Sequence, residues 1–132
     1  MGLFDGIART AARLVKKPAS TECGEQMAVD FLKDKGFVIL ERNFRCREGE
    51  IDIICSDGNN LCFVEVKSRS NFAHGFPEEF VDRRKRKKIT IAASAYIKNN
   101  RVGSKPMRFD VIAVDLSKGS VRILEGAFEA EF

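Results

Sequence analysis

Two acidic side chains and one lysine, Asp52, Glu65 and Lys67, stand at positions from which they could act together on one substrate. Paired carboxylates bind hard divalent cations, and a nearby lysine can orient or deprotonate a water molecule or stabilise charge that develops on a phosphate. These residue types therefore suggest metal-dependent chemistry on a phosphate ester. A solvated network in which the lysine neutralises Glu65 would use the same residues, and the pattern alone does not separate the two interpretations.

A predicted β-hairpin would bring these residues together. Residues 50–56 and 61–68 have strand-like composition, and the four residues between them, Asp57-Gly58-Asn59-Asn60, are typical of a turn. If Ser56 pairs with Leu61, Asp52 lies opposite Glu65. One face of the hairpin then carries three carboxylates and an amine: Glu50, Asp52, Glu65 and Lys67. The other face carries apolar residues that must be buried: Ile51, Ile53, Val64 and Val66.

The chain separates its charges. It has 132 residues, with 23 Lys and Arg against 19 Asp and Glu and a net charge of +4. Residues 21–66 hold 5 basic and 10 acidic side chains, whereas residues 67–110 hold 12 basic and 4 acidic ones, including six consecutive cations at 83–88. This segregation favours a polyanionic partner and a recruited cation. The six cations oppose the dipole of the helix that they begin, so they indicate either phosphate contacts or a solvated helix face.

The predicted elements form one α/β sheet with helices on its faces. We expect a basic amphipathic helix over residues 3–17, and a second helix from a cap at Ser20 or Thr21 to Lys35. Strands follow at 37–42, 50–56 and 61–68, then a helix near 79–99 and strands at 107–114 and 121–124. The helix near 79–99 predicts a parallel crossover between the strands that flank it. Residues 1–18 would be a helical extension that docks on its own domain, on a membrane or on a partner, and residues 19–132 would be the domain itself.

The cysteines and the apolar runs exclude several classes of protein. The four cysteines form no C-x-x-C pair, and one histidine cannot complete a usual Cys/His zinc site, so we expect free thiols in a reducing compartment. The longest apolar run, residues 37–40, is far shorter than the roughly 20 residues of a membrane span. We therefore expect a soluble, cytoplasmic protein without a membrane span.

Asp52 and the following Glu65-Val66-Lys67, with Glu25 on a preceding helix, resemble the active-site layout of the PD-(D/E)XK nuclease superfamily, which includes restriction endonucleases and archaeal Holliday junction resolvases. Over roughly residues 22–128 the chain is similar to the YraN-like bacterial family of that superfamily. The runs and residues that carry this closer likeness are Gly24-Glu25, Arg42-Asn43-Phe44-Arg45, Gly49-Glu50-Ile51-Asp52-Ile53-Ile54, Phe63-Val64-Glu65-Val66-Lys67-Ser68-Arg69, Gly75, Pro77, Val81, Lys85 and Arg108-Phe109-Asp110-Val111.

The resemblance implies a restriction-endonuclease-like core, with a central mixed sheet built from a three-strand antiparallel meander, a crossover helix and further strands. It implies that Asp52, Glu65 and the Val66 carbonyl bind Mg²⁺ or Mn²⁺, that Lys67 is the catalytic lysine, and that Glu25 completes or supports the site. The expected function is that of a metal-dependent endonuclease on DNA, with branched or junction DNA among the candidate substrates. The alternative is a nucleic-acid-binding module with weak or no catalysis. A homodimer would match a two-fold substrate.

Several basic residues are candidates for contacts with nucleic acid: Arg45, Arg47, Arg69, Arg83, Arg84, Lys85 and Lys88. His74 lies on a predicted loop, and we expect it to be a surface residue rather than a catalytic one. Asp110 suits two roles, a further acidic ligand or a structural partner of Arg108, and the sequence does not distinguish them.

Overall fold

The computed structural model describes residues 19–70, 72 and 81–132. The predicted helix at 3–17 and the loop residue His74 lie outside these residues. The elements follow in the order α2 (Ala19–Asp34), β1 (Val38–Cys46), β2 (Gly49–Ser56), β3 (Leu61–Arg69), α3 (Arg83–Asn100), β4 (Met107–Asp115) and β5 (Ser120–Phe128).

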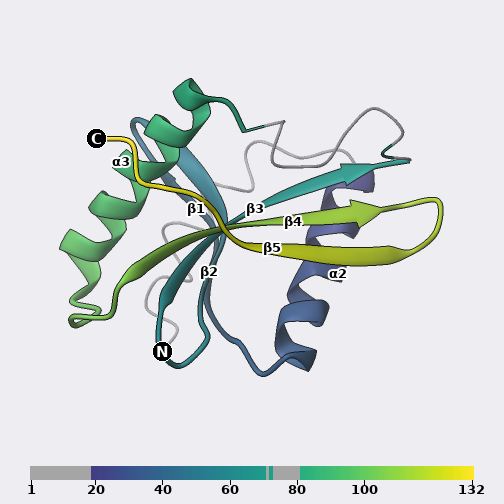
Figure 1. Cartoon of the computed structure of the whole chain (residues 1–132), viewed down its shortest axis with the longest axis horizontal. Helices are drawn as coiled ribbons and strands as arrows, with labels where there is room; N and C mark the ends of the chain where they lie inside the picture. Colours follow the sequence, from purple (N-terminus) through teal and green to yellow (C-terminus); the bar gives the residue numbers. More distant parts are fainter. Residues whose placement is uncertain (1–18, 71, 73–80) are drawn as a thin grey trace.

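The five strands form one mixed sheet in the order β1-β2-β3-β4-β5. The pairs β1–β2, β2–β3 and β4–β5 are antiparallel, whereas β3 and β4 are parallel and are connected through α3. The helices α2 and α3 lie on opposite faces of the sheet (Figure 1). The predicted α/β architecture and the parallel crossover are therefore confirmed, and the arrangement is consistent with a restriction-endonuclease-like core.

Each face of the sheet has its own apolar core. On one face, α3 packs Ile89, Ala92 and Tyr96 against a cluster that includes Phe63 and Phe109. On the other face, α2 contributes Ala28, Val29 and Leu32 to a second cluster, in which the strands provide Ile53, Cys55, Cys62, Val64, Ile112 and Val114. Alternate residues of β3 therefore point to different helices. The odd-numbered residues, such as Leu61 and Phe63, face α3, and the even-numbered ones face α2.

The hairpin between β2 and β3 has the predicted register, since Ser56 pairs with Leu61 and Cys55 with Cys62. The predicted continuous apolar face is wrong at one position. Ile51 packs in the α3 cluster, whereas Ile53 packs in the α2 cluster. Strict alternation fails here because the β2–β3 ladder ends at the pair Ile53 and Val64, so Ile51 is not held in register with β3. The β1 strand is also irregular beside this point, at Asn43, which has a positive φ of 54°.

The start of α3 also differs from the prediction near residue 79. Val81 and Asp82 are not helical, and the Asp82 carboxylate accepts a hydrogen bond from the Lys85 N–H at 2.9 Å. This N-cap fixes the first helical residue at Arg83. At α2 the helix already includes Ser20 and Thr21, so neither of them is the predicted cap.

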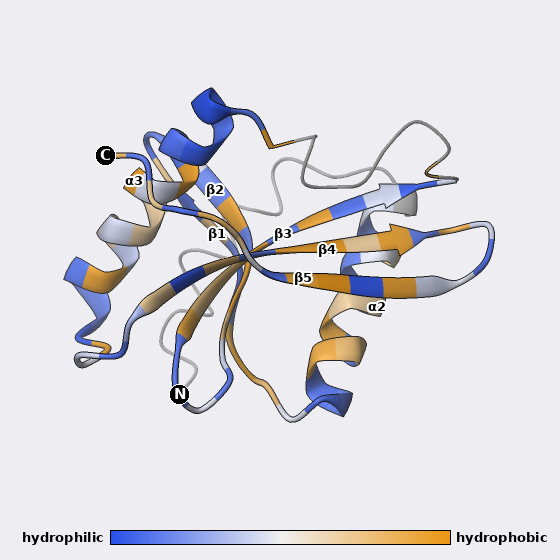
Figure 2. Cartoon of the chain, viewed as in Figure 1, coloured by the Kyte–Doolittle hydropathy of each residue, from blue (hydrophilic) through white to orange (hydrophobic). Residues whose placement is uncertain are grey.

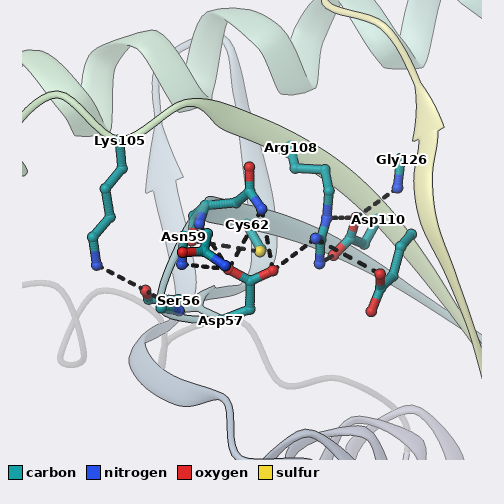
Figure 3. Close-up of polar contacts among 11 residues, drawn as sticks. Ser56, Asp57, Asn59, Cys62, Lys105, Arg108, Asp110 and Gly126 are labelled. Carbon is teal, nitrogen blue, oxygen red and sulfur yellow. Dashed lines mark hydrogen bonds and ion pairs between the residues drawn. The ribbon is translucent and has the colours of Figure 1, made fainter.

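A polar network holds the turn of the hairpin against β4 and β5 (Figure 3). Arg108 donates two hydrogen bonds of 2.9 Å to the buried carboxylate of Asp110 and one of 2.7 Å to Asp57. The Gly126 N–H on β5 also donates to Asp110, at 2.9 Å. Asp110 is therefore a structural partner of Arg108, the second of its two predicted roles. Among the described helices, none is long and apolar enough to cross a membrane.

Candidate active site

The ladder between β2 and β3 ends where the candidate site begins. The last backbone pair joins Ile53 and Val64, and beyond it the Val66 N–H donates to the Asp52 carboxylate at 2.8 Å. The Asp52 side chain thus takes the place of a backbone acceptor. Because the N–H and C=O groups of one strand residue point to the same edge, the Val66 carbonyl also faces the gap beside Asp52.

Glu65 is a buried charged group of the site, with a side chain only 8 % exposed. Two ammonium groups approach the same carboxylate oxygen, Oε2: Lys67 Nζ lies 3.4 Å away and Lys85 Nζ lies 3.3 Å away. Burial, and then the negative charge of Asp52, raise the pKa of Glu65 to about 7, although both lysines act in the opposite direction. This carboxyl group therefore titrates close to neutral pH, and any added positive charge nearby would stabilise its ionised form.

Glu50 does not join the two carboxylates, contrary to the prediction. It pairs with Arg45 across β1 and β2, its carboxylate lies 3.5 Å from the Arg45 guanidinium, and its side chain is 44 % exposed. Within the described ranges, no group of three or more His, Cys, Asp or Glu side chains is placed to hold a metal ion. The predicted convergence of three carboxylates is therefore wrong, because a neighbouring arginine on β1 takes one of them.

The remaining donors suit a hard divalent cation. Asp52 and Glu65 provide two carboxylates, and the Val66 carbonyl faces the same gap. Mg²⁺ is usually bound through one or two carboxylates and keeps several water molecules, so this set needs no third acid. Oxygen donors alone also suit Mn²⁺ and do not suit a thiophilic metal. The residues present therefore fit the cation that the nuclease resemblance implies.

Glu25 is buried in α2, next to Gly24, which lies against β3. A Cβ atom on the adjacent Gly24 would meet the side chain of Ser68, with 2.9 Å to the Ser68 Cβ, so only glycine permits this approach. Ser68 follows Lys67 directly, which brings the start of α2 to the strand segment that carries the site. Since no cluster of three acids is present in the described chain, the structure favours a supporting position for Glu25 over a direct third ligand.

The six consecutive cations of α3 divide into three groups. Lys85 points to Glu65, as described above. Arg83 and Arg86 both contact Glu131 near the C-terminus, at 3.3 Å and 3.6 Å. Arg84, Lys87 and Lys88 are exposed, and the described part of the chain offers none of them an ion-pair partner. Figure 2 shows these first turns of α3 as the strongly hydrophilic end of the helix.

The predicted basic residues outside α3 lie at the same end of the sheet. Arg47 is exposed in the turn between β1 and β2, two residues before Gly49. A Cβ atom on Gly49 would lie 3.4 Å from the Lys88 Cβ, so this turn is in contact with α3. Arg45 lies close to Glu50, and the exposed Arg69 ends β3 two residues after Lys67. Contacts thus connect Lys85 with Glu65 and the turn between β1 and β2 with Lys88, and Arg69 lies at the carboxyl end of β3.

The contact between Lys85 and Glu65 was not predicted, because Lys85 was assigned to nucleic-acid contacts with its neighbours. The chain enters a crossover helix from the carboxyl end of β3, where Lys67 and Arg69 follow Glu65. That rule could have placed the first turn of α3 near the site. It could not have selected Lys85 among six consecutive cations, because the selection depends on the cap at Asp82.

Comparisons with known proteins agree on one family. Residues 24–114 match the model of the uncharacterised protein family UPF0102. A UPF0102 protein of Clostridioides difficile (strain 630) is 49 % identical over 105 residues, which cover 80 % of this chain and 92 % of the relative. UPF0102 proteins of Clostridium botulinum (strain Hall) and Syntrophus aciditrophicus (strain SB) are 46 % and 41 % identical, over 80 % and 91 % of this chain and 90 % and 96 % of their own lengths. The matched segment contains Glu25, Asp52, Glu65, Lys67 and Lys85, and the chain belongs to the UPF0102 family.

Proposed function

We propose that this protein is a metal-dependent endonuclease that hydrolyses phosphodiester bonds of DNA. The observation that carries the proposal is the buried Glu65 carboxylate, which lies beside Asp52 and has a lysine amine 3.4 Å away, at a point where two strands separate. A buried acid beside a second acid is rare unless a cation or a proton relieves their repulsion.

Each residue of the site has a distinct task in this proposal. Asp52, Glu65 and the Val66 carbonyl would hold Mg²⁺ or Mn²⁺, which supplies Lewis-acid polarisation of the phosphate and an activated water nucleophile when bound. Lys67 projects beside Glu65 and stabilises the negative charge that develops on the phosphate during attack. Glu25 supports the strand that carries Lys67 from the side of α2.

The basic surface supports DNA as the substrate. Arg84, Lys87 and Lys88 are exposed on α3, and Arg47 is exposed on the adjoining turn, so cations from two segments are available to a phosphate backbone. Binding through such contacts weakens steeply as salt rises. Branched and junction DNA belong in the substrate panel because the resemblance includes junction resolvases.

The test is a cleavage assay on duplex, single-stranded, flapped and four-way-junction DNA with Mg²⁺ or Mn²⁺. We expect Asp52→Asn to reduce cleavage by about 100-fold or more. Asp34→Asn makes the same chemical change on an exposed residue at the last position of α2 and is expected to cleave like the wild type. The proposal fails if the wild type binds these substrates and cuts none of them, or if both variants cut equally well.

A second candidate function is a nucleic-acid-binding module without catalysis. The observation in its favour is that the amines of Lys67 and Lys85 both lie within ion-pair distance of Glu65 and can neutralise its carboxylate. Calorimetric titration with Mn²⁺ separates the two candidates. Binding that Asp52→Asn abolishes favours the nuclease, whereas salt-dependent DNA binding without any cation binding favours the module.

A further inference from the structure

The first turn of α3 is held rigidly beside the candidate site. Asp82 caps the helix through the Lys85 N–H at 2.9 Å, and the preceding Val81 is buried in the core. The Arg86 guanidinium donates a hydrogen bond of 3.0 Å to the Val81 carbonyl, which ties the helix to the segment before it. The backbone of Lys85 is therefore fixed, and only its side chain is free to move.

Lys85 and Lys67 share one oxygen of Glu65, but they are not equivalent. Lys67 comes from the same strand as Glu65 and its side chain is 18 % exposed, whereas Lys85 comes from α3 and its side chain is 40 % exposed. A divalent cation bound through Glu65 would repel both ammonium groups at these distances. Lys85 is the one that can leave, because its exposed side chain can return to solvent at little cost.

Once it leaves Glu65, the Lys85 side chain lies among exposed cations that can bind phosphates. Arg84, Lys87 and Lys88 flank Lys85 along α3 and are exposed, so a DNA backbone bound to them would bring phosphates to the same turn. A lysine that is paired with Glu65 cannot also neutralise a phosphate. The position of Lys85 between the carboxylate site and the exposed cations therefore makes two binding events compete for one ammonium group.

We propose that Lys85 is a positioning residue that couples cation binding to DNA binding. It pairs with Glu65 while the site holds no divalent cation, and it transfers to a phosphate of the DNA when a cation takes its place. This inference rests on the proposed function, because it assumes a cation site at Asp52 and Glu65. Coupling of this kind is reciprocal, so the cation must strengthen DNA binding by the same factor by which DNA strengthens cation binding.

The experiment measures binding rather than cleavage. Mn²⁺ affinity is measured by calorimetry without DNA, and the affinity for a short duplex is measured by fluorescence anisotropy with and without Mn²⁺, with the DNA checked for integrity afterwards. The variant is Lys85→Met, which keeps most of the length of the side chain and removes the charge. Lys98→Met is the matched control, because it removes the same charge from an exposed position in the last turn of the same helix, away from the site. Thermal unfolding verifies that both variants are folded.

We expect Lys85→Met to bind Mn²⁺ about fivefold or more tightly than the wild type, and Lys98→Met to bind it within about twofold of the wild type. Mn²⁺ should raise the DNA affinity of the wild type and of Lys98→Met by a similar factor, and this increase should be lost in Lys85→Met. If Lys85 had only a structural role, Lys85→Met would change the stability of the protein without removing the increase in DNA affinity that Mn²⁺ causes.

Two results would overturn the inference, and they are distinguishable. If Asp52→Asn abolishes Mn²⁺ binding but Lys85→Met binds Mn²⁺ as Lys98→Met does, the cation site stands and the role of Lys85 is refuted. If the wild type binds no Mn²⁺ at all, the proposed function fails together with the inference.

Discussion

Replacement of Glu65 by glutamine should stabilise the protein at alkaline pH when no divalent cation is present. Glutamine resembles the protonated form of Glu65, which the buried site prefers. The pKa of Glu65 rises from 4.5 to about 7 on folding, so the folded state binds more protons than the unfolded chain between these values. The free energy of unfolding of the wild type therefore falls as pH rises through this window and stays lower above it.

The size of the effect follows from the same change in pKa. A rise from 4.5 to about 7 corresponds to about 3 kcal/mol of lost stability at pH 8, and the near-complete burial of Glu65 makes solvent screening small. The two lysine contacts are already part of this balance, because they lower the pKa that burial raises. We expect Glu65→Gln to be more stable than the wild type by up to about 3 kcal/mol at pH 8 and equally stable near pH 4.

The assay is urea unfolding at a series of pH values from 4 to 8 in the presence of a chelator. Glu48→Gln is the matched control, since Glu48 is exposed in the turn between β1 and β2, and its unfolding free energy should stay within about 0.5 kcal/mol of the wild type. Added Mg²⁺ should reduce the difference in unfolding free energy between Glu65→Gln and the wild type, because a bound cation stabilises the ionised carboxylate of Glu65. If Glu65→Gln is less stable than the wild type at pH 8, the lysine contacts outweigh burial and the reasoning is refuted.

Three further predictions concern packing, charge and thiol reactivity. Gly24→Ala should lower the unfolding free energy, measured in urea, by about 1–3 kcal/mol, because the added methyl group meets Ser68. Adding Ser68→Gly to the same chain should recover part of this loss. Equal losses in the single and the double variant would contradict the contact. Glu131→Gln should tighten DNA binding by about twofold to fivefold in anisotropy titrations, because it releases Arg83 and Arg86 of α3 from their ion pairs. An unchanged affinity would show that these arginines do not contact DNA. Cys23 is exposed and should react with a thiol reagent in the native protein. Cys55 should react only after unfolding, because the neighbouring Cys62 thiol and burial raise its pKa. Labelling of Cys55 in the native protein would contradict its burial.

The sheet was predictable because its signals are local and mutually consistent. Alternation along residues 50–56 and 61–68, joined by the turn at 57–60, fixes the register, and the structure pairs Ser56 with Leu61 accordingly. The helix between the third and fourth strands predicts their parallel pairing for a topological reason that does not depend on detail.

The details that failed depend on neighbours that a pattern does not reveal. Glu50 was grouped with the candidate ligands, but it pairs with Arg45 on a strand whose register the sequence did not specify. Ile51 changes face because the β2–β3 ladder ends at Ile53, so pairing with β3 does not fix its orientation. The start of α3 depends on the cap at Asp82, and that cap in turn directs Lys85 to Glu65. These features arise from tertiary contacts that override alternation and charge patterning.

The central claim is that Asp52, Glu65 and Lys67 form a metal-dependent site for phosphodiester hydrolysis. The most direct measurement is cleavage of the DNA panel by the wild type, Asp52→Asn and Asp34→Asn, each with Mg²⁺ and with a chelator. The account predicts products only with Mg²⁺, from the wild type and Asp34→Asn, and a loss of about 100-fold or more in Asp52→Asn. Cleavage by Asp52→Asn at the wild-type rate, or products that form equally well in the chelator, would contradict it.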